Sequence, residues 1–180
     1  MKSMRNLLVI SVLGENKPGI LEAITQSCLT CSCSIAESRM FLFEDRLALT
    51  LLLQGTWDAI AKFETQLAKL EVELDLTITG QRTNVKNNKE KEKIPYAVEI
   101  ISVERPDIIH QMLHFFSMQG TEIEEMTSSK YSTFHSGTSM FCLNMTVSVS
   151  ADISIASMRS EFLDFCDQQN FDAVIEPAKY

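Results

Sequence analysis

The stretch from Glu15 to Gly19, Glu-Asn-Lys-Pro-Gly, combines groups that can bind a small anion. It follows an apolar run, residues 6–13, and leads into a helical pattern that begins at Pro18, since proline suits the first helical position. Gly19 has no side chain, so a ligand can approach the free N–H groups of the first turn, where the helix dipole favours a carboxylate. Asn16 is expected to cap this turn or to bond beside it. The alternative is that Pro-Gly only starts a helix.

Three cysteines follow in the pattern Cys-x-x-Cys-x-Cys, at Cys28, Cys31 and Cys33. A structural zinc site needs four ligands, and Cys142 and Cys166 lack the spacing of a second pair. Small buried residues are therefore the favoured interpretation. The odd number of cysteines, with no disulfide-like framework, predicts reduced thiols.

Two further groups of residues have the composition of a site but not its spacing. His110 and His114 are four apart on a predicted helix, yet no third metal ligand accompanies them. Three carboxylates lie on one predicted strand, those of Glu122, Glu124 and Glu125. Because neighbours on a strand point to opposite faces, we expect an exposed strand edge and not an acid/base pair. The sequence thus predicts no catalytic residue, no metal, no cofactor and no enzyme.

The hydrophobic pattern of the first half predicts the order strand, helix, strand, strand, helix, strand. The strands are expected at residues 6–13, from 35, at 47–53 and at 71–78, with helices at 18–31 and 57–70. Because the first and third strands are the most apolar, they are expected in the middle of a four-stranded antiparallel sheet with both helices on one face. This is the ferredoxin-like βαββαβ arrangement of the α+β class.

A less regular copy of the pattern follows, in which Pro106 lies 88 residues after Pro18. Gly120 then corresponds to Ser32, at a turn that favours a left-handed residue. Asp107 replaces Gly19, and its carboxylate is expected to repel an anionic ligand in the second copy. The sequence therefore predicts two tandem domains, residues 1–80 and 95–180, joined by a polar linker at 81–94.

The composition excludes several classes of function. The chain of 180 residues has a formal net charge of −8, whereas direct binding of nucleic acid needs a basic surface. No apolar run approaches the roughly 20 residues of a membrane helix, and the N-terminus lacks a signal-peptide cleavage pattern. We expect a cytoplasmic protein that binds neither nucleic acid nor a membrane.

The first half resembles an ACT domain, and the whole chain resembles the tandem-ACT glycine cleavage system transcriptional repressor family. The resemblance is carried by VISVLGENKPGIL (9–21), CSCSIAESRM (31–40) and LLLQGTWDAIAKFETQL (51–67). ACT domains bind small amino acids between paired domains, against the loop after the first strand and the start of a neighbouring second strand. The resemblance implies a ligand site at Asn16, Lys17, Pro18, Gly19 and Ile20, with Ser34 or Glu122 from the second strand.

The resemblance also implies a mechanism, namely indirect repression of the glycine cleavage operon. In this family the protein binds a DNA-binding activator, and glycine releases it. A homodimer is also expected, since ACT sites commonly assemble from paired domains. Three alternatives stay open: an interaction module without a ligand, a sensor of another small amino acid, and, as the weakest, an enzyme.

Overall fold

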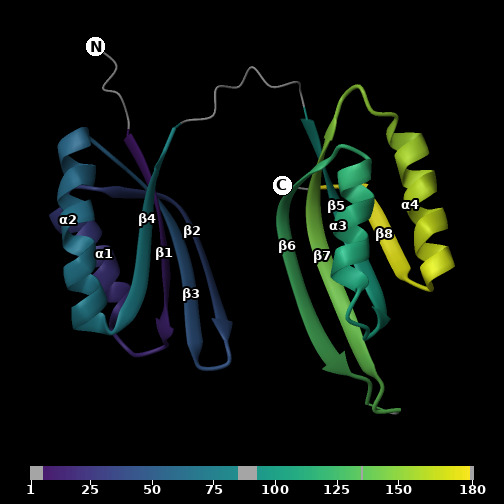
Figure 1. Cartoon of the computed structure of the whole chain (residues 1–180), viewed down its shortest axis with the longest axis horizontal. Helices are drawn as coiled ribbons and strands as arrows, with labels where there is room; N and C mark the ends of the chain where they lie inside the picture. The colour runs from purple at the N-terminus through teal and green to yellow at the C-terminus, as the bar shows by residue number, and fades with distance from the viewer. Residues whose placement is uncertain (1–5, 85–92, 135, 179–180) are drawn as a thin grey trace. The chain divides into compact units, whose positions relative to one another are not determined.

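The computed structural model describes residues 6–84, 93–134 and 136–178. The chain divides into two compact units, residues 1–87 and 88–180. In each unit two helices cover one face of a four-stranded antiparallel sheet (Figure 1). The predicted α+β, tandem ferredoxin-like fold is therefore confirmed.

Unit 1 has the strand order β2-β3-β1-β4, with the two most apolar strands in the middle as predicted. Alternate residues of β1 and β3, such as Leu8, Ile10 and Leu53, are 0–1% exposed beneath the helices. The large side chains Ile60 and Phe63 of the second helix close this core. The elements are β1 (Asn6–Glu15), α1 (Ile20–Thr30), β2 (Ser34–Phe43), β3 (Arg46–Gly55), α2 (Trp57–Leu74) and β4 (Leu76–Thr83).

The predicted strand at 71–78 is wrong in its first half, because α2 continues to Leu74 and β4 begins at Leu76. The alternation of 71–78 fits a strand, but Leu70 also continues the helical spacing and is buried in the core. Asp75 ends the helix in the left-handed conformation, with φ of 54°. Val72, an apolar residue of the expected strand, is instead 84% exposed on the helix.

Unit 2 repeats the topology with the strand order β6-β7-β5-β8. Its core is built around Phe116, Leu143 and Phe162, which are fully buried. The elements are β5 (Lys93–Val103), α3 (Ile108–Met118), β6 (Glu122–Ser132), β7 (Ser139–Ser150), α4 (Ile155–Gln169) and β8 (Asp172–Pro177).

The repeat is accurate to the single residue at the bulge of the second strand. The second strand of each unit has a bulge at the same position, between Ile35 and Glu37 in β2 and between Ile123 and Glu125 in β6. The expected linker at 81–94 is shortened at both ends, because β4 continues to Thr83 and β5 begins at Lys93. Residues 85–92 of it lie outside the described residues.

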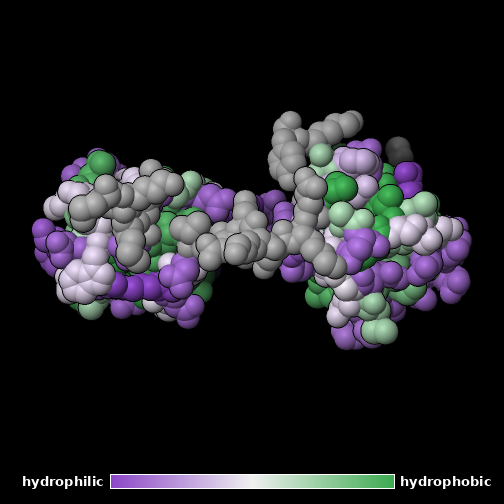
Figure 2. Space-filling model, turned by 90° about the horizontal axis from the view of Figure 1, so that it is seen from above, coloured by the Kyte–Doolittle hydropathy of each residue, from purple (hydrophilic) through white to green (hydrophobic). Residues whose placement is uncertain are grey.

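The surface carries hydrophobic residues among the polar ones. Figure 2 shows hydrophilic residues over much of the visible surface of each unit, with hydrophobic residues between them. The end of β1 and the β2–β3 hairpin of unit 1 contribute Leu13, Phe41 and Phe43, which are 44–64% exposed. No helix among the described residues has both the length and the hydropathy to cross a membrane.

The turn after α1 predicts a stabilising substitution. Ser32 has φ of 59°, whereas the corresponding residue of unit 2, Gly120, has φ of 65°. The left-handed region costs an L-residue about 1–2 kcal/mol, which glycine avoids. Against this gain, the greater conformational freedom of glycine in the unfolded chain lowers stability by about 0.4–1 kcal/mol. Ser32→Gly is therefore expected to raise the free energy of unfolding by roughly 0.5–1 kcal/mol in urea titration. Gly120→Ser, the reverse change, should lower it. A lower urea midpoint for Ser32→Gly would contradict this account.

Candidate amino-acid site

The loop between β1 and α1 differs in detail from the expectation. The helix begins at Ile20, so Pro18 is not its first residue, and Gly19 is the N-cap with φ of 88°. Glycine is needed here for its backbone conformation, because L-residues avoid positive φ. The Asn16 side chain does not cap the helix. Instead, the Asn16 backbone N–H donates to the carbonyl of Asp45 at 2.9 Å and ties the loop to the β2–β3 turn.

A hollow of about 340 Å³ lies against this loop. Its lining consists of Asn16, Lys17, Pro18, Gly19, Leu21 and Glu22. The structure thus brings four of the predicted residues together at one surface. The fifth, Ile20, is only 4% exposed and packs into the core below. Leu21 and Glu22 are additions that the sequence analysis did not name.

The first turn of α1 leaves two N–H groups for a ligand. Ile20 donates to the Lys17 carbonyl at 3.4 Å, and Ala23 donates to the Gly19 carbonyl at 2.9 Å. The N–H groups of Leu21 and Glu22, which line the hollow, donate to no carbonyl of the described loop residues. Such groups at the positive end of a helix favour an anion.

Lys17 lies between two carboxylates. Its Nζ is 3.4 Å from Glu15 Oε2 and 3.4 Å from Asp75 Oδ2. The hydrogen bond to Glu15, together with Asp75, raises the pKa of Lys17. Two carboxylates of the chain thus already lie within ion-pair distance of the lysine ammonium group, and an anionic ligand would compete with them for it. No sequence signal indicated Asp75, which is 58 residues away along the chain.

The two residues expected from second strands lie elsewhere. Ser34 begins β2 opposite Gln54, in the row of the sheet that contains Leu7, whereas the loop follows Glu15 at the other end of β1. The eight residue-to-residue steps from Leu7 to Glu15 span about 26 Å. Ser34 therefore cannot reach the loop of its own unit, and its hydroxyl donates to the Gln54 carbonyl at 3.1 Å. Glu122 begins β6 in unit 2, where it forms an ion pair with Lys93 at 2.6 Å.

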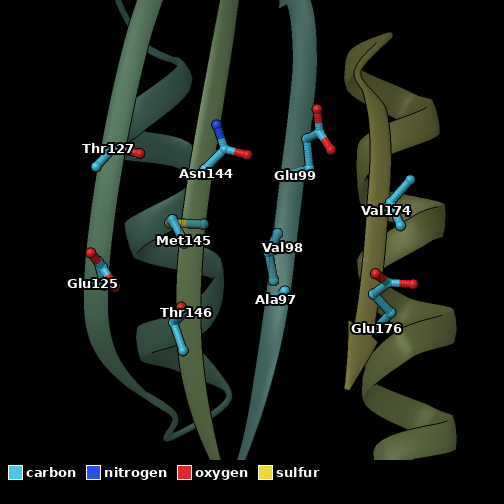
Figure 3. Close-up of a pocket in the computed structure, with 10 residues that line it drawn as sticks. All are labelled: Ala97, Val98, Glu99, Glu125, Thr127, Asn144, Met145, Thr146, Val174 and Glu176. Atoms are coloured by element: carbon cyan, nitrogen blue, oxygen red, sulfur yellow. The ribbon is translucent and has the colours of Figure 1, made fainter. Parts of the chain in front are cut away.

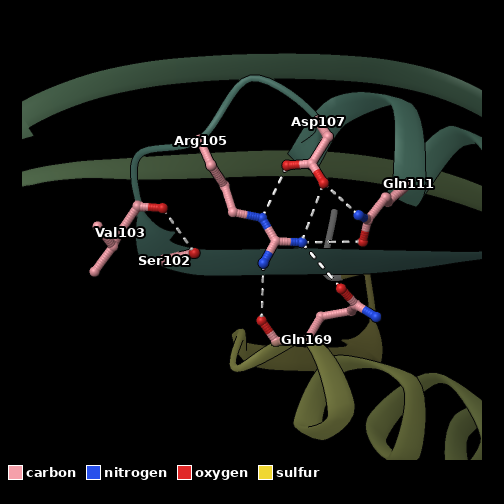
Figure 4. A network of polar contacts seen from close by, with 6 residues as sticks. All are labelled: Ser102, Val103, Arg105, Asp107, Gln111 and Gln169. Atoms are coloured by element: carbon pink, nitrogen blue, oxygen red, sulfur yellow. Dashed lines mark hydrogen bonds and ion pairs between the residues drawn. The ribbon is translucent and has the colours of Figure 1, made fainter.

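The corresponding loop of unit 2 is filled by its own side chains (Figure 4). Arg105 Nε donates to Asp107 Oδ1 at 2.8 Å, and Arg105 Nη2 donates to Gln169 Oε1 at 3.0 Å. The guanidinium also lies 4.8 Å from the ring centre of Phe171. Asp107 accepts a further hydrogen bond from Gln111 at 2.5 Å. The network connects the start of α3 to the end of α4. The Asp107 carboxylate is therefore already paired within the chain.

This network makes the stability of unit 2 depend on pH. Partial burial opposes ionisation of Asp107, but the hydrogen bonds from Arg105 and Gln111 hold its pKa below the ordinary value. A carboxylate with a depressed pKa in the folded state stabilises that state at pH values above its unfolded-state pKa, near 3.9. This stabilisation is lost as the pH falls through the folded-state pKa. Arg105→Met is thus expected to lower the urea midpoint at pH 7, with a smaller difference from wild type below about pH 4.

The matched control for this prediction is Arg159→Met, which removes an exposed arginine with no ion pair among the described residues. Its effect on the urea midpoint should be small and independent of pH. If Arg105→Met changes the midpoint equally at pH 7 and at pH 3, the ion pair with Asp107 is not the cause.

A second hollow, of about 250 Å³, lies on the sheet of unit 2 (Figure 3). The carboxylates of Glu99, Glu125 and Glu176 lie around it, with Thr127 and Asn144 beside them. The three carboxylates lie on three different strands, β5, β6 and β8, and stay apart, as Figure 3 shows. No group of three or more histidine, cysteine or acidic residues in the described ranges could hold a metal ion.

The remaining candidate residues have structural positions. Cys28, Cys31 and Cys33 are 1–5% exposed, as predicted. Burial raises the pKa of Cys28 to about 11 and that of Cys166 to about 12, so both thiols stay protonated at neutral pH. The rings of His110 and His114 stack at 6.3 Å on the exposed side of α3.

The comparison with known families concerns unit 1 first. Residues 6–81 match the family model of the ACT domain. Unit 1 is an ACT domain. Unit 2 has the same topology and the same bulge, so the chain is a tandem ACT-like protein.

Full-length relatives of this tandem ACT-like protein include a transcriptional regulator. The glycine cleavage system transcriptional repressor of Escherichia coli is 26% identical over 180 residues, which cover 99% of this chain and 93% of that protein. The same protein of Shigella flexneri matches equally.

Two solved structures share the fold over the whole chain. A crystal structure described as a glycine cleavage system transcriptional repressor has a TM-score of 0.73 at 20% identity, and covers 99% of this chain and 100% of its own. A protein of unknown function from Galdieria sulphuraria has a TM-score of 0.77 at 14% identity, and covers 97% and 99%.

Proposed function

We propose that this protein is a cytoplasmic regulator that senses glycine and represses transcription of the glycine cleavage operon by binding a DNA-binding activator. The observation that carries the ligand site is the hollow at the β1–α1 loop, where unpaired N–H groups of α1 meet the side chains of Asn16 and Glu22. The similarity to a transcriptional repressor over 99% of the chain supports the regulatory role.

The site is suited to both charges of a free amino acid. The carboxylate of the ligand would accept hydrogen bonds from the N–H groups of Leu21 and Glu22, at the positive end of α1. The Asn16 amide, which is exposed, would donate a further bond. The ammonium group would bind the Glu22 carboxylate, which lines the same hollow.

A second copy of the chain is proposed to complete the site. Within unit 1, Ser34 lies at the far end of the sheet from the loop, about 26 Å away along β1. If the start of β2 contributes to ligand binding, as the family resemblance implies, it must come from a neighbouring domain. We propose that this domain belongs to a second copy of the chain, in a homodimer.

Repression through a protein partner agrees with the charge of the chain. A formal net charge of −8 disfavours contact with phosphates, so we propose an activator protein, and not DNA, as the direct partner. The proposal assigns this protein no catalytic activity, in line with a relative that is a transcriptional repressor.

One observation favours a second candidate, an ACT-type interaction module without a ligand. In unit 2 the Arg105–Asp107 pair occupies the loop, which there has a structural role and not a ligand-binding one. If unit 1 uses its loop in the same way, the chain binds only proteins. A sensor of serine or alanine is the remaining alternative, because these differ from glycine only by a small side chain.

The test is isothermal titration of the full chain with glycine, serine and alanine, and with glycinamide as a matched ligand that lacks the carboxylate. Saturable heat with glycine, and none with glycinamide, is expected. Glycine should then also release the activator in a binding assay with both purified proteins. If serine or alanine binds more tightly than glycine, that amino acid replaces glycine as the proposed ligand. If none of the amino acids binds, the proposal of a sensor is wrong and the interaction module without a ligand is favoured.

A further inference from the structure

A hollow of about 290 Å³ in unit 2 is separate from the loop site. It lies between the start of α4 and the strands β5 and β8, on the side of the sheet that the helices cover, where Ile175 is 2% exposed. Five of the six residues that line it are apolar or aromatic, and the sixth is an arginine: Tyr96, Ile155, Ala156, Ile175, Pro177 and Arg159.

The two units differ at this place in one register position. In unit 1, Arg82 of β4 lies opposite Leu8 of β1. In unit 2, Pro177 of β8 lies opposite Tyr96, which is the residue of β5 that corresponds to Leu8 in the repeat. A long cationic side chain in one unit is therefore replaced by a short ring in the other.

In unit 1 the arginine covers the start of the helix. The Arg82 guanidinium lies 5.6 Å from the ring centre of Trp57, the first residue of α2, and donates two hydrogen bonds to Glu64, at 2.9 and 2.7 Å. Pro177 has no side chain that could reach Ile155, the first residue of α4, in the same way. The space that Arg82 covers in unit 1 thus stays open as a hollow in unit 2.

Arg159 supplies the one charge of the hollow. The residues three and four positions away on α4, which share its side of the helix, are Ile155, Ala156, Phe162 and Leu163, and none is acidic. Arg159 is exposed, and no ion pair or hydrogen bond joins it to another described residue. The first turn of α4 also carries no acidic residue, so the local field favours an anion.

We propose that this hollow binds a small carboxylic acid with a branched or aromatic hydrocarbon body, whose carboxylate pairs with Arg159. An apolar cavity of about 150 Å³ holds a benzene molecule, so a hollow of about 290 Å³ has room for a ring and a short chain. The lining contains no carboxylate to receive an ammonium group. The hollow therefore takes acids without an amine, which distinguishes it from the amino-acid site of unit 1.

The experiment titrates the full chain with 3-phenylpropionate and with its neutral analogue, 3-phenylpropan-1-ol. Saturable binding of the acid is expected. Arg159→Gln should lower the affinity for the acid at least tenfold and leave the affinity for the alcohol nearly unchanged, because only the acid pairs with the arginine charge. Lys62→Gln is the matched control, since it removes one exposed positive charge from α2, the corresponding helix of unit 1.

A second variant tests the position of the hollow without its charge. Ala156 is exposed at the second position of α4, so Ala156→Phe can fill the hollow and leave the core in place. It should abolish binding of both probes at an unchanged urea midpoint. The proposal is overturned if the wild type shows no saturable binding of the acid, if Arg159→Gln weakens it no more than Lys62→Gln, or if Ala156→Phe still binds it. Glycine titration of the same variants reports on the loop site separately.

Discussion

Replacement of Gly19 by aspartate is expected to weaken glycine binding at least tenfold. A Cβ at this position meets no atom within 4 Å, so the side chain has space, although φ of 88° strains the backbone of any L-residue. The new carboxylate would lie at the positive end of α1, where the carboxylate of the ligand is proposed to bind. Like charges at one helix end repel, and about 1.4 kcal/mol is a factor of ten in affinity. Isothermal titration with glycine measures the effect.

The matched control is Gly19→Asn, which has the same shape without the charge. Asparagine tolerates positive φ better than most residues, so both variants carry a similar backbone strain. Gly19→Asn is expected to keep glycine binding within a few-fold of wild type. Equal losses in both variants would indicate that shape, and not charge, excludes the ligand. Wild-type affinity in Gly19→Asp would place the amino-acid site elsewhere.

Truncation of Phe162 to alanine is expected to cost about 3–5 kcal/mol of stability. The side chain is 0% exposed, and its ring lies 5.6 Å from that of Phe115 and 5.5 Å from that of Phe116. Removal of the ring leaves a cavity between α3, α4 and the sheet that the rigid neighbours cannot fill. Because domains are stable by only about 5–15 kcal/mol, unit 2 should unfold at a much lower urea concentration.

Phe134→Ala is the control for this effect, since Phe134 lies in the β6–β7 turn and is fully exposed. Its change in the free energy of unfolding should stay within about 0.5 kcal/mol. Urea unfolding followed by circular dichroism compares the two variants. A loss below about 1 kcal/mol for Phe162→Ala would mean that the core of unit 2 can repack around the missing ring.

Two helix boundaries that the sequence predicted incorrectly have separate physical causes. Residues 71–78 fit a strand by alternation, yet the first four are helical in the structure. Glu71 shows why local periodicity is insufficient, because its carboxylate accepts a hydrogen bond at 2.7 Å from the N–H of Ile78 on the following strand. Pro18 likewise fitted a first helical position, but the left-handed Gly19 delays the helix by two residues.

The sequence by itself determined the fold and the place of the candidate site. Apolar strands at β1 and β3, helical spacing between them and an 88-residue repeat are local or periodic signals, and each depends on burial of one face. The Glu-Asn-Lys-Pro-Gly loop could be located in the same way, as the junction of a strand and a helix.

Only the tertiary structure decided which distant side chains meet each loop. Lys17 meets Asp75, and Arg105 meets Gln169, across 58 and 64 residues, so neither contact has a sequence pattern. The first contact places a second carboxylate beside Lys17, and the second holds the Arg105 side chain in the loop of unit 2, where it pairs with Asp107. Contacts between residues far apart in the sequence arise only when separate elements pack together, which is why the composition of a loop cannot show all the partners of its groups.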